Sequence, residues 1–218
     1  MALLPEVKKH YGKLKFYING SWVASESDLI YEDVNPATGE VIAEFPSATD
    51  SDIEQAIQSA QAALASWREV PLRDKARYLF DLRGKFEEHF DMLYRVLVQD
   101  HGRTIGEARG TLRRCIENIE SACSAALLLT KGECVTDLAK GLDQALYWEP
   151  RGVFLIITPN NIPMHAWSSY VPYAIASGCP VVVSPSKNDP VCMDAIFKVT
   201  EEVEGFPPGL VNLVYGGS

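Results

Sequence analysis

The chain has 218 residues, of which 47% are apolar and 22% charged, with a formal net charge of −9. This composition is ordinary for a globular protein, and its excess of acids argues against general nucleic-acid binding, which needs a clustered basic face. No apolar run reaches the length of a membrane span, and the amino terminus lacks the features of a signal or transit peptide, so we expect a cytoplasmic protein with no membrane partner.

The amino-terminal part of the sequence predicts two β-hairpins and then a helix. Asn19-Gly20 within Phe16–Val23 is the strongest short hairpin signal, because a type I′ turn needs a positive φ at both central residues. The segment Val34–Phe45 repeats this pattern around a turn of Asn, Pro and Gly residues. A helix is predicted after Thr49, which offers a cap to the apolar residues that follow at helical spacing.

The middle of the chain is predicted to be helical. A long apolar stripe begins after Pro71 and ends at Gly102, and a second helix is expected over Gly106–Leu129. A short strand is then expected at Ala145–Trp148.

The last part of the sequence alternates strands with helices. Strands are predicted at Val153–Ile157, Pro180–Val183 and Leu210–Tyr215, and helices at Pro163–Ser177 and from Asp189 to about Glu204. Short connections between successive strands and helices imply right-handed crossovers and a parallel sheet. We therefore predict an α/β fold that contains about half of a doubly wound parallel-sheet domain.

Polar loops follow the first two of these strands, where open α/β sheets bind ligands. In the first loop, the side-chain amide of Asn161 can donate to a developing oxyanion, which is worth roughly 3–4 kcal/mol in an acyl-transfer site. The alternative is that Asn160 or Asn161 only caps the following helix or forms an Asx-turn.

The second loop carries Ser184 and Lys187, which suit a ribose and a phosphate. The alternative is a solvated surface turn. No G-x-G-x-x-G motif follows any strand, so a nucleotide site here must be unconventional.

The cysteines and histidines predict neither disulfides nor a metal site. The five cysteines form no CxxC pair and the four histidines are scattered, so we expect free thiols that are mostly buried, and no metal.

Five ordered segments carry a family resemblance over nearly the whole chain: Y-I-N-G-S-W-V, N-P-A-T-G-E-V-I-A, I-I-T-P-N-N-I-P, A-I-A-S-G-C-P-V-V-V-S-P-S and F-P-P-G-L-V-N-L-V-Y-G. Together they resemble the amino-terminal half of the aldehyde dehydrogenase superfamily. The stretches R-C-I-E-N-I-E-S-A-C and L-Y-W-E-P-R-G-V-F are most similar to the methylmalonate-semialdehyde dehydrogenase branch.

The resemblance implies a cofactor domain for NAD or NADP and a role for each loop residue. It places Thr158, Pro159 and Asn160 beside the nicotinamide and makes Asn161 the catalytic amide that stabilises an oxyanion. It places Ser184, Lys187 and Asn188 at the adenosine ribose and Gly216 near the adenine edge.

Three positions depart from the family pattern. The family usually has lysine at Ser184, glutamate at Lys187 and an aromatic residue at Asn160. A glutamate accepts hydrogen bonds from the ribose 2′-hydroxyl, whereas an ammonium group cannot accept them. Two hypotheses follow: Lys187 shifts the preference toward a 2′-phosphate, or ribose binding has degraded.

The family's cysteine nucleophile and glutamate base belong to the half that would follow residue 218, and none of the cysteines here matches that nucleophile. The resemblance therefore implies one incomplete cofactor domain over 1–218, with small β or oligomerisation elements at about 14–45 and 140–152 and no catalytic domain.

We accordingly expect the chain to be inactive alone and to act on an aldehyde only with the missing half, with coenzyme A as a co-substrate of the complete enzyme. The expected partner is a second chain or further copies in a homo-oligomer. The alternatives are a non-catalytic nucleotide-binding or assembly module and a fragment without independent function.

Overall fold

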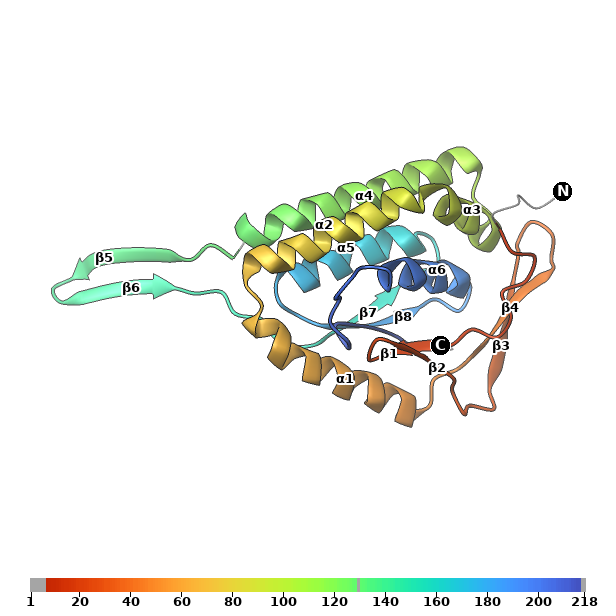
Figure 1. The fold of residues 1–218 in the computed structure, drawn as a ribbon, viewed down its shortest axis with the longest axis horizontal. Helices are drawn as coiled ribbons and strands as arrows, with labels where there is room; N and C mark the ends of the chain where they lie inside the picture. The colour runs from red at the N-terminus through yellow and green to blue at the C-terminus, as the bar shows by residue number, and fades with distance from the viewer. Residues whose placement is uncertain (1–6, 129, 217–218) are drawn as a thin grey trace.

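A five-stranded mixed sheet organises the chain in the computed structural model, which describes residues 7–128 and 130–216 (Figure 1). Its strand order is β2-β1-β9-β8-β7. The bounds are Phe16–Ile18 for β1, Ser21–Val23 for β2, Phe154–Thr158 for β7, Val181–Pro185 for β8 and Val211–Leu213 for β9. Strands β7, β8 and β9 are parallel, whereas β1 pairs antiparallel with both β2 and β9. The α/β prediction with a parallel sheet is confirmed.

The first hairpin forms as predicted, with Asn19 at φ 53° and Gly20 at φ 75°. These positive φ values are those of a type I′ turn. The hairpin is not a separate small element, however, because Tyr17 pairs with Leu213 and so extends the parallel strands into a larger sheet. The sequence gives no local sign of this pairing.

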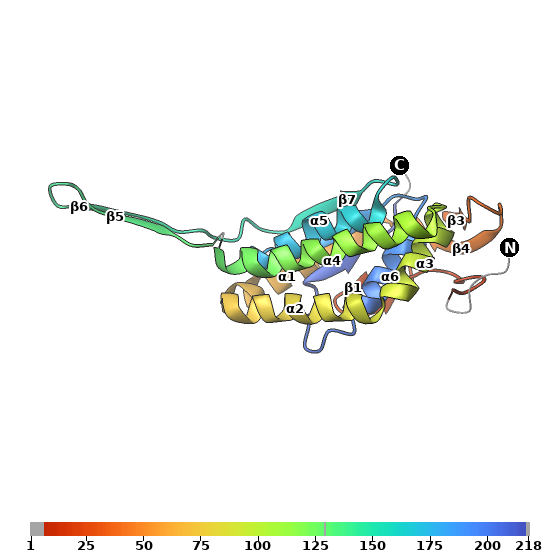
Figure 2. The ribbon, with the colours of Figure 1, turned by 90° about the horizontal axis from the view of Figure 1, so that it is seen from above.

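Helices cover both faces of the sheet. Helix α1 (Asp50–Glu69) lies against β8 and β9 on one face, while α5 (Pro163–Ala176) and α6 (Pro190–Thr200) lie on the other (Figures 1 and 2). An outer layer is formed by α2 (Leu72–Glu88), α3 (Phe90–His101) and α4 (Ile105–Leu128). Leu129, the predicted end of the last of these helices, lies outside the described residues.

Local signals set several helix ends. Thr49 and Asp52 form a capping box at the start of α1, and Gly102 ends α3 in a left-handed conformation with φ 78°. The predicted helical region between Pro71 and Gly102 is two helices, because the backbone leaves helical geometry at His89. Helix α6 ends at Thr200, earlier than predicted, and turns follow it.

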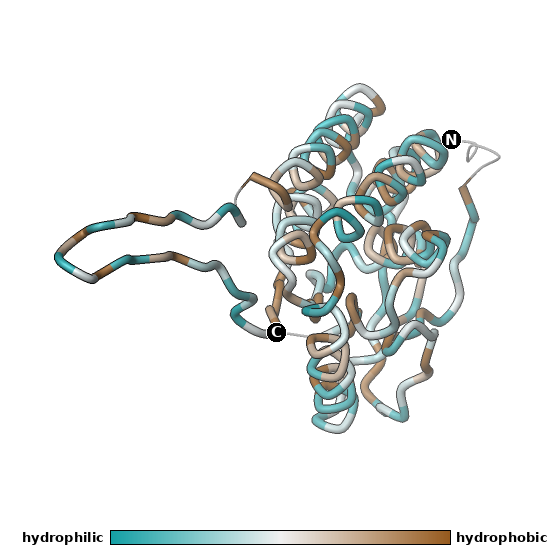
Figure 3. The backbone as a smooth tube through the Cα atoms, turned by 60° about the vertical axis from the view of Figure 1, so that its left-hand side comes forward, coloured by the Kyte–Doolittle hydropathy of each residue, from teal (hydrophilic) through white to brown (hydrophobic). Residues whose placement is uncertain are grey.

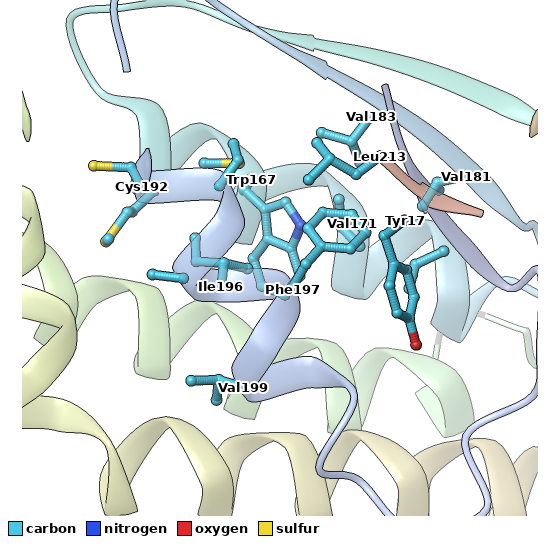
Figure 4. Packing of buried hydrophobic residues seen from close by; sticks show 14 of the residues in the cluster. Tyr17, Trp167, Val171, Val181, Val183, Cys192, Ile196, Phe197, Val199 and Leu213 are labelled. Carbon is cyan, nitrogen blue, oxygen red and sulfur yellow. The ribbon is translucent and has the colours of Figure 1, made fainter. Parts of the chain in front are cut away.

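The core lies between the sheet and the α5–α6 layer (Figure 4). Trp167 of α5 is fully buried and stacks on Phe86 of α2 with ring centroids 5.4 Å apart. Phe197 of α6 meets the ring of Tyr17 edge-on at 5.6 Å and so joins the helix layer to the first hairpin. Burying side chains of this size stabilises the fold by roughly 1.5–3 kcal/mol each.

Two further hairpins lie outside the main sheet. Strands β3 (Ile30–Val34) and β4 (Val41–Pro46) form the second predicted hairpin. Strands β5 (Glu133–Ala139) and β6 (Leu142–Leu146) form a long hairpin that projects from the body, with polar and apolar residues interspersed along it (Figures 1 and 3).

The projecting hairpin corrects two sequence predictions. The small β element expected at about 140–152 begins at Glu133, and the strand expected at Ala145–Trp148 ends at Leu146. Tyr147 and Trp148 follow the strand with 81% and 61% of their surface exposed. Among the described residues, no helix is both long and apolar enough to cross a membrane.

Asn212 of β9 is fully buried and connects four parts of the fold. Its Nδ2 donates to the carbonyl oxygens of Gly209 at 2.8 Å and Val181 at 3.2 Å. Its Oδ1 accepts from the backbone N–H of Asn19 and the hydroxyl of Ser59, each at 3.1 Å. One amide thus joins the first hairpin, α1 and β8 to β9.

We expect Asn212→Ala to lower the free energy of unfolding by about 3 kcal/mol, because it leaves several buried polar groups unpaired at about 1–3 kcal/mol each. Urea unfolding monitored by tryptophan fluorescence measures this. Gln58→Ala on the exposed side of α1 is the control, with an expected change below about 0.5 kcal/mol. A loss below about 1 kcal/mol for Asn212→Ala would contradict the assignment.

Candidate functional site

The carboxyl ends of the three parallel strands bring the predicted site loops together. Thr158 at the end of β7 lies beside Pro185, and its carbonyl oxygen accepts from the N–H of Ser186 at 3.1 Å. Gly216 follows β9, and a Cβ placed on it would lie 3.6 Å from the hydroxyl oxygen of Ser184. The sheet therefore places the two loops and Gly216 at one edge, as ligand sites in open α/β sheets require.

A largely apolar pocket of ≈ 590 Å³ lies between α1 and the sheet, with Ser184 among its lining residues. Its apolar wall comes from Ile53, Ile57 and Leu64 of α1 and from Leu155, Ile157 and Val182 of the sheet. Apolar walls with a few polar groups are typical of small-molecule sites. This pocket can take a flat apolar ring with a hydroxyl-bearing group near Ser184.

A second pocket of ≈ 430 Å³ holds the other predicted polar residues, Asn160, Lys187 and Asn188. Ser184 lines the apolar pocket, whereas Lys187 and Asn188, three and four residues further along the same loop, line this one. The second pocket is acidic, since its other lining residues include Glu32, Asp33, Asp100 and Asp189. A phosphate bound at Lys187 would therefore lie close to carboxyl groups.

Three of these carboxyl groups are almost fully buried, with exposures of 2% for Asp33, 1% for Asp100 and 2% for Asp189. Asp100 accepts from the backbone N–H of Cys192 at 2.6 Å. Burial is the main cause that raises the pKa of Asp33 to about 6 and that of Asp189 to about 7. Burial, with the neighbouring charge of Asp33, raises the pKa of Asp100 well above its usual range.

The charge of Asp33 lies close enough to Asp100 to raise the pKa of that carboxyl group. Oδ2 of Asp33 and Oδ1 of Asp100 are buried without a hydrogen-bond partner. Burial without a partner disfavours the charged form of a carboxyl group, which is the direction of both pKa shifts. Asp189 occupies the N-cap position of α6, but its side chain makes no capping hydrogen bond.

Asn161 lies in the exposed loop before α5, where its carbonyl oxygen accepts a hydrogen bond from Nη2 of Arg103. The same guanidinium donates from Nη1 to Thr111 at 3.3 Å. Helix α5 begins after Ile162 without a side-chain cap, so Asn161 does not cap it. The side-chain amide of Asn161 is thus presented by a loop whose backbone is held by Arg103.

Sequence reasoning missed Arg103, because its partner is 58 residues away. The only local signal is its position directly after the helix-ending Gly102. The other two residues of the first loop differ in exposure: Thr158 is buried with an unpartnered Oγ1, and Pro159 is exposed.

The cysteines do not supply an activated nucleophile at this edge. Cys115, Cys123, Cys179 and Cys192 are buried, and Cys134 lies exposed on the projecting β5–β6 hairpin. Burial raises the pKa of Cys115 to about 12 and that of Cys123 to about 11, and it also raises the pKa of Cys192 well above the usual range. A nucleophilic thiol needs the opposite shift.

One group in the described part of the chain could offer three ligand atoms to a metal ion: Glu88, His89 and Glu202. The ammonium group of Lys85 already contacts Glu88 at 2.9 Å and Glu202 at 3.4 Å. Its positive charge occupies the place that a metal cation would need.

Comparison with protein families finds a match to the aldehyde dehydrogenase family over residues 22–218. Among curated proteins, the chain is 38% identical over 203 residues to malonate-semialdehyde dehydrogenase 1 of Geobacillus kaustophilus. This match covers 93% of the chain but 41% of that relative, so the chain spans about two fifths of the relative's length.

Solved structures share the fold. A methylmalonate-semialdehyde dehydrogenase from Oceanimonas doudoroffii superposes with a TM-score of 0.90 at 35% identity, over 95% of this chain and 42% of that one. A mutant of aldehyde dehydrogenase C from Pseudomonas syringae, complexed with NAD+ and octanal, gives a TM-score of 0.85 at 31% identity, over 94% of this chain and 41% of that one.

The buried acids make stability depend on pH in a defined direction. A carboxyl group whose pKa is higher in the folded than in the unfolded chain destabilises the fold as pH rises between the two values. For Asp189 this window runs from about 4 to about 7. We expect Asp189→Asn to raise the free energy of unfolding, relative to the parent chain, by on the order of 2 kcal/mol more at pH 8 than at pH 4.5.

Urea unfolding at the two pH values measures this difference. The control is Asp81→Asn, which changes an exposed aspartate on α2 and should show no comparable pH dependence. Equal effects of Asp189→Asn at both pH values would show that the Asp189 carboxyl is not protonated in the folded chain.

Proposed function

This chain belongs to the aldehyde dehydrogenase family, and from this membership we propose that it is the cofactor-binding half of an NAD(P)-dependent aldehyde dehydrogenase. It corresponds to the amino-terminal part of the family's enzymes. The observation that carries the proposal is the meeting of both strand-end loops and Gly216 at one sheet edge, beside the apolar pocket under α1.

The residues present fit a dinucleotide. The apolar pocket offers room for an adenine ring, and Ser184 offers a hydroxyl to the adenosine ribose. Gly216 leaves open the space next to that hydroxyl. Thr158, Pro159 and Asn160 lie on the nicotinamide side. The complex of the Pseudomonas syringae relative with NAD+ supports this assignment.

In the complete enzyme, the nicotinamide would accept a hydride from the substrate. Asn161 would donate its side-chain amide to the oxyanion that forms when a thiolate attacks the aldehyde, and such donors are worth roughly 3–4 kcal/mol. The thiolate would come from a cysteine outside this chain, since burial suppresses ionisation of Cys115, Cys123 and Cys192. Arg103 would keep the Asn161 loop in position.

The relatives suggest the substrate class. The Geobacillus relative is named for malonate semialdehyde and the Oceanimonas relative for methylmalonate semialdehyde. We propose a short semialdehyde as the substrate and coenzyme A or water as the acceptor of the acyl group.

A second candidate function is a non-catalytic nucleotide-binding or assembly module. The projecting β5–β6 hairpin favours it, because this hairpin and the following Tyr147 and Trp148 expose apolar surface far from the strand-end site. Exposed apolar surface of this kind is typical of contacts between subunits.

We expect the purified 218-residue chain to bind NAD or NADP without oxidising aldehydes. Calorimetric titration measures binding, and absorbance of the reduced cofactor measures turnover of malonate semialdehyde with and without coenzyme A. Oxidation that disappears when a cysteine of this chain is changed to serine would overturn the assignment of the nucleophile to another segment. Failure to bind either cofactor would favour the assembly module.

Lys187 provides a test of cofactor preference. If its ammonium group contacts a 2′-phosphate, Lys187→Glu should lower the affinity for NADP relative to NAD by about tenfold or more, because one favourable charge contact becomes a repulsion. Lys15→Glu makes the same charge change at another exposed lysine and serves as the control. An equal loss for both cofactors would place Lys187 away from the 2′ position, as the acids around it would also favour.

A further inference from the structure

His165 of helix α5 is a half-buried histidine whose ring has no partner. Within the described part of the chain, no group forms a hydrogen bond or ion pair with the ring, and Nδ1 is buried without a hydrogen-bond partner. An imidazole ring always carries at least one N–H donor, and polar atoms that are buried in a protein are usually hydrogen-bonded. The ring of His165 is therefore available to a ligand.

The backbone at His165 is held in place by hydrogen bonds. Its carbonyl oxygen accepts from the hydroxyl groups of Ser168 and Ser169, each at 2.8 Å. The side-chain amide of Asn118 on α4 donates to the same two hydroxyl oxygens, at 3.1 and 3.2 Å. These bonds connect the first turns of α5 to α4 and leave the ring of His165 unbonded.

Asn161 shows the same arrangement four residues earlier. Its carbonyl oxygen accepts from Arg103, whereas its side-chain amide forms no hydrogen bond with any described residue. Asn161 directly precedes Ile162, the N-cap of α5, whose carbonyl oxygen accepts from the N–H of Ala166 at 2.8 Å. Four residues correspond to about one helical turn, which is about 5.4 Å long. His165 therefore lies about one turn beyond Asn161 along α5.

A short semialdehyde has two oxygen-bearing ends at a matching separation. With C–C bonds of about 1.5 Å and C=O bonds of about 1.2 Å, the aldehyde and carboxylate oxygens of extended malonate semialdehyde lie roughly 5 Å apart. The aldehyde oxygen becomes the oxyanion that Asn161 would bind. A carboxylate only accepts hydrogen bonds, and the N–H group of an imidazole can donate to it.

We propose that His165 binds the distal carboxylate of the semialdehyde while Asn161 binds its aldehyde oxygen, so that His165 selects substrates that carry an acid group. This inference rests on the proposed function, because it assigns a substrate contact to the same site. An alkyl aldehyde, such as the octanal bound to the Pseudomonas syringae relative, has no group that could accept from His165.

The probe is malonate, which carries the proposed carboxylate and needs neither cofactor nor nucleophile. In the purified 218-residue chain, malonate at constant ionic strength should shift the ring proton resonances of His165 saturably. Malonamide, its uncharged analogue, should not shift them. The resonances are assigned by their loss in His165→Leu. Equal shifts with malonamide, or no shift with malonate, overturn the proposal.

Three variants separate the proposed contact from general anion binding. His165→Leu removes the donor and should weaken malonate binding in calorimetric titration by about fivefold or more, while thermal unfolding shows that the chain still folds. His165→Lys supplies another N–H donor and should recover most of the affinity. His10→Leu changes an exposed histidine and should bind malonate like the parent chain.

Two results with these variants would overturn the proposal. One is undiminished binding by His165→Leu, and the other is binding by His165→Lys that is no tighter than that of His165→Leu. A loss in His10→Leu equal to that in His165→Leu would likewise show that malonate has no specific site at His165.

Failure of this contact can be distinguished from failure of the proposed function. Malonate titration reports on His165 without a cofactor, and NAD(P) titration reports on the strand-end site without a carboxylate ligand. NAD(P) binding without a malonate effect at His165 would refute the substrate contact alone. A malonate effect at His165 without NAD(P) binding would refute the cofactor role alone.

Discussion

One buried amide holds the site-forming parts of this molecule together. Asn212 accepts from the first hairpin and from α1 and donates to β8, so all four of its hydrogen bonds cross between elements or loops. The loop before β9 lies very close to α1, since a Cβ placed on Gly209 would be 2.6 Å from the carbonyl oxygen of Ser59. With α1 held over the sheet in this way, the apolar pocket beside Ser184 has its second wall. A satisfied buried network of this kind specifies one arrangement, because any other leaves polar groups unpaired.

The strand-end site combines two electrostatic environments. Beside Ser184 the surface is mainly apolar, whereas Lys187 shares its pocket with buried acids that burial keeps partly protonated near neutral pH. A cofactor that spanned both pockets would contact mainly apolar side chains at one end, and Lys187 and the buried acids at the other. The exposed loop of Asn161 is held through its backbone by a hydrogen bond from Arg103.

The chain has a well-packed core and also exposes apolar surface. Trp67, Trp167, Phe86 and Phe197 are fully buried, so the helices and the sheet have a core of their own. Apolar surface is exposed mainly at the edge of β7 and on the projecting β5–β6 hairpin. Both surfaces belong to strands whose backbone edges or faces are uncovered.

Features that depend on residues close together in the sequence could be predicted. They are the Asn19-Gly20 turn, the cap at Thr49, the alternation of strands and helices that makes β7, β8 and β9 parallel, and the polar loops at the ends of these strands. Only the tertiary structure decided that β1 joins β9, that Arg103 holds the Asn161 loop and that Lys187 lies among buried acids. The physical reason is how far apart the interacting residues lie in the sequence. Turns and caps are set by local dihedral preferences and hydrogen bonds, whereas a contact such as Asn19 to Asn212, 193 residues apart, leaves no periodic trace in the sequence.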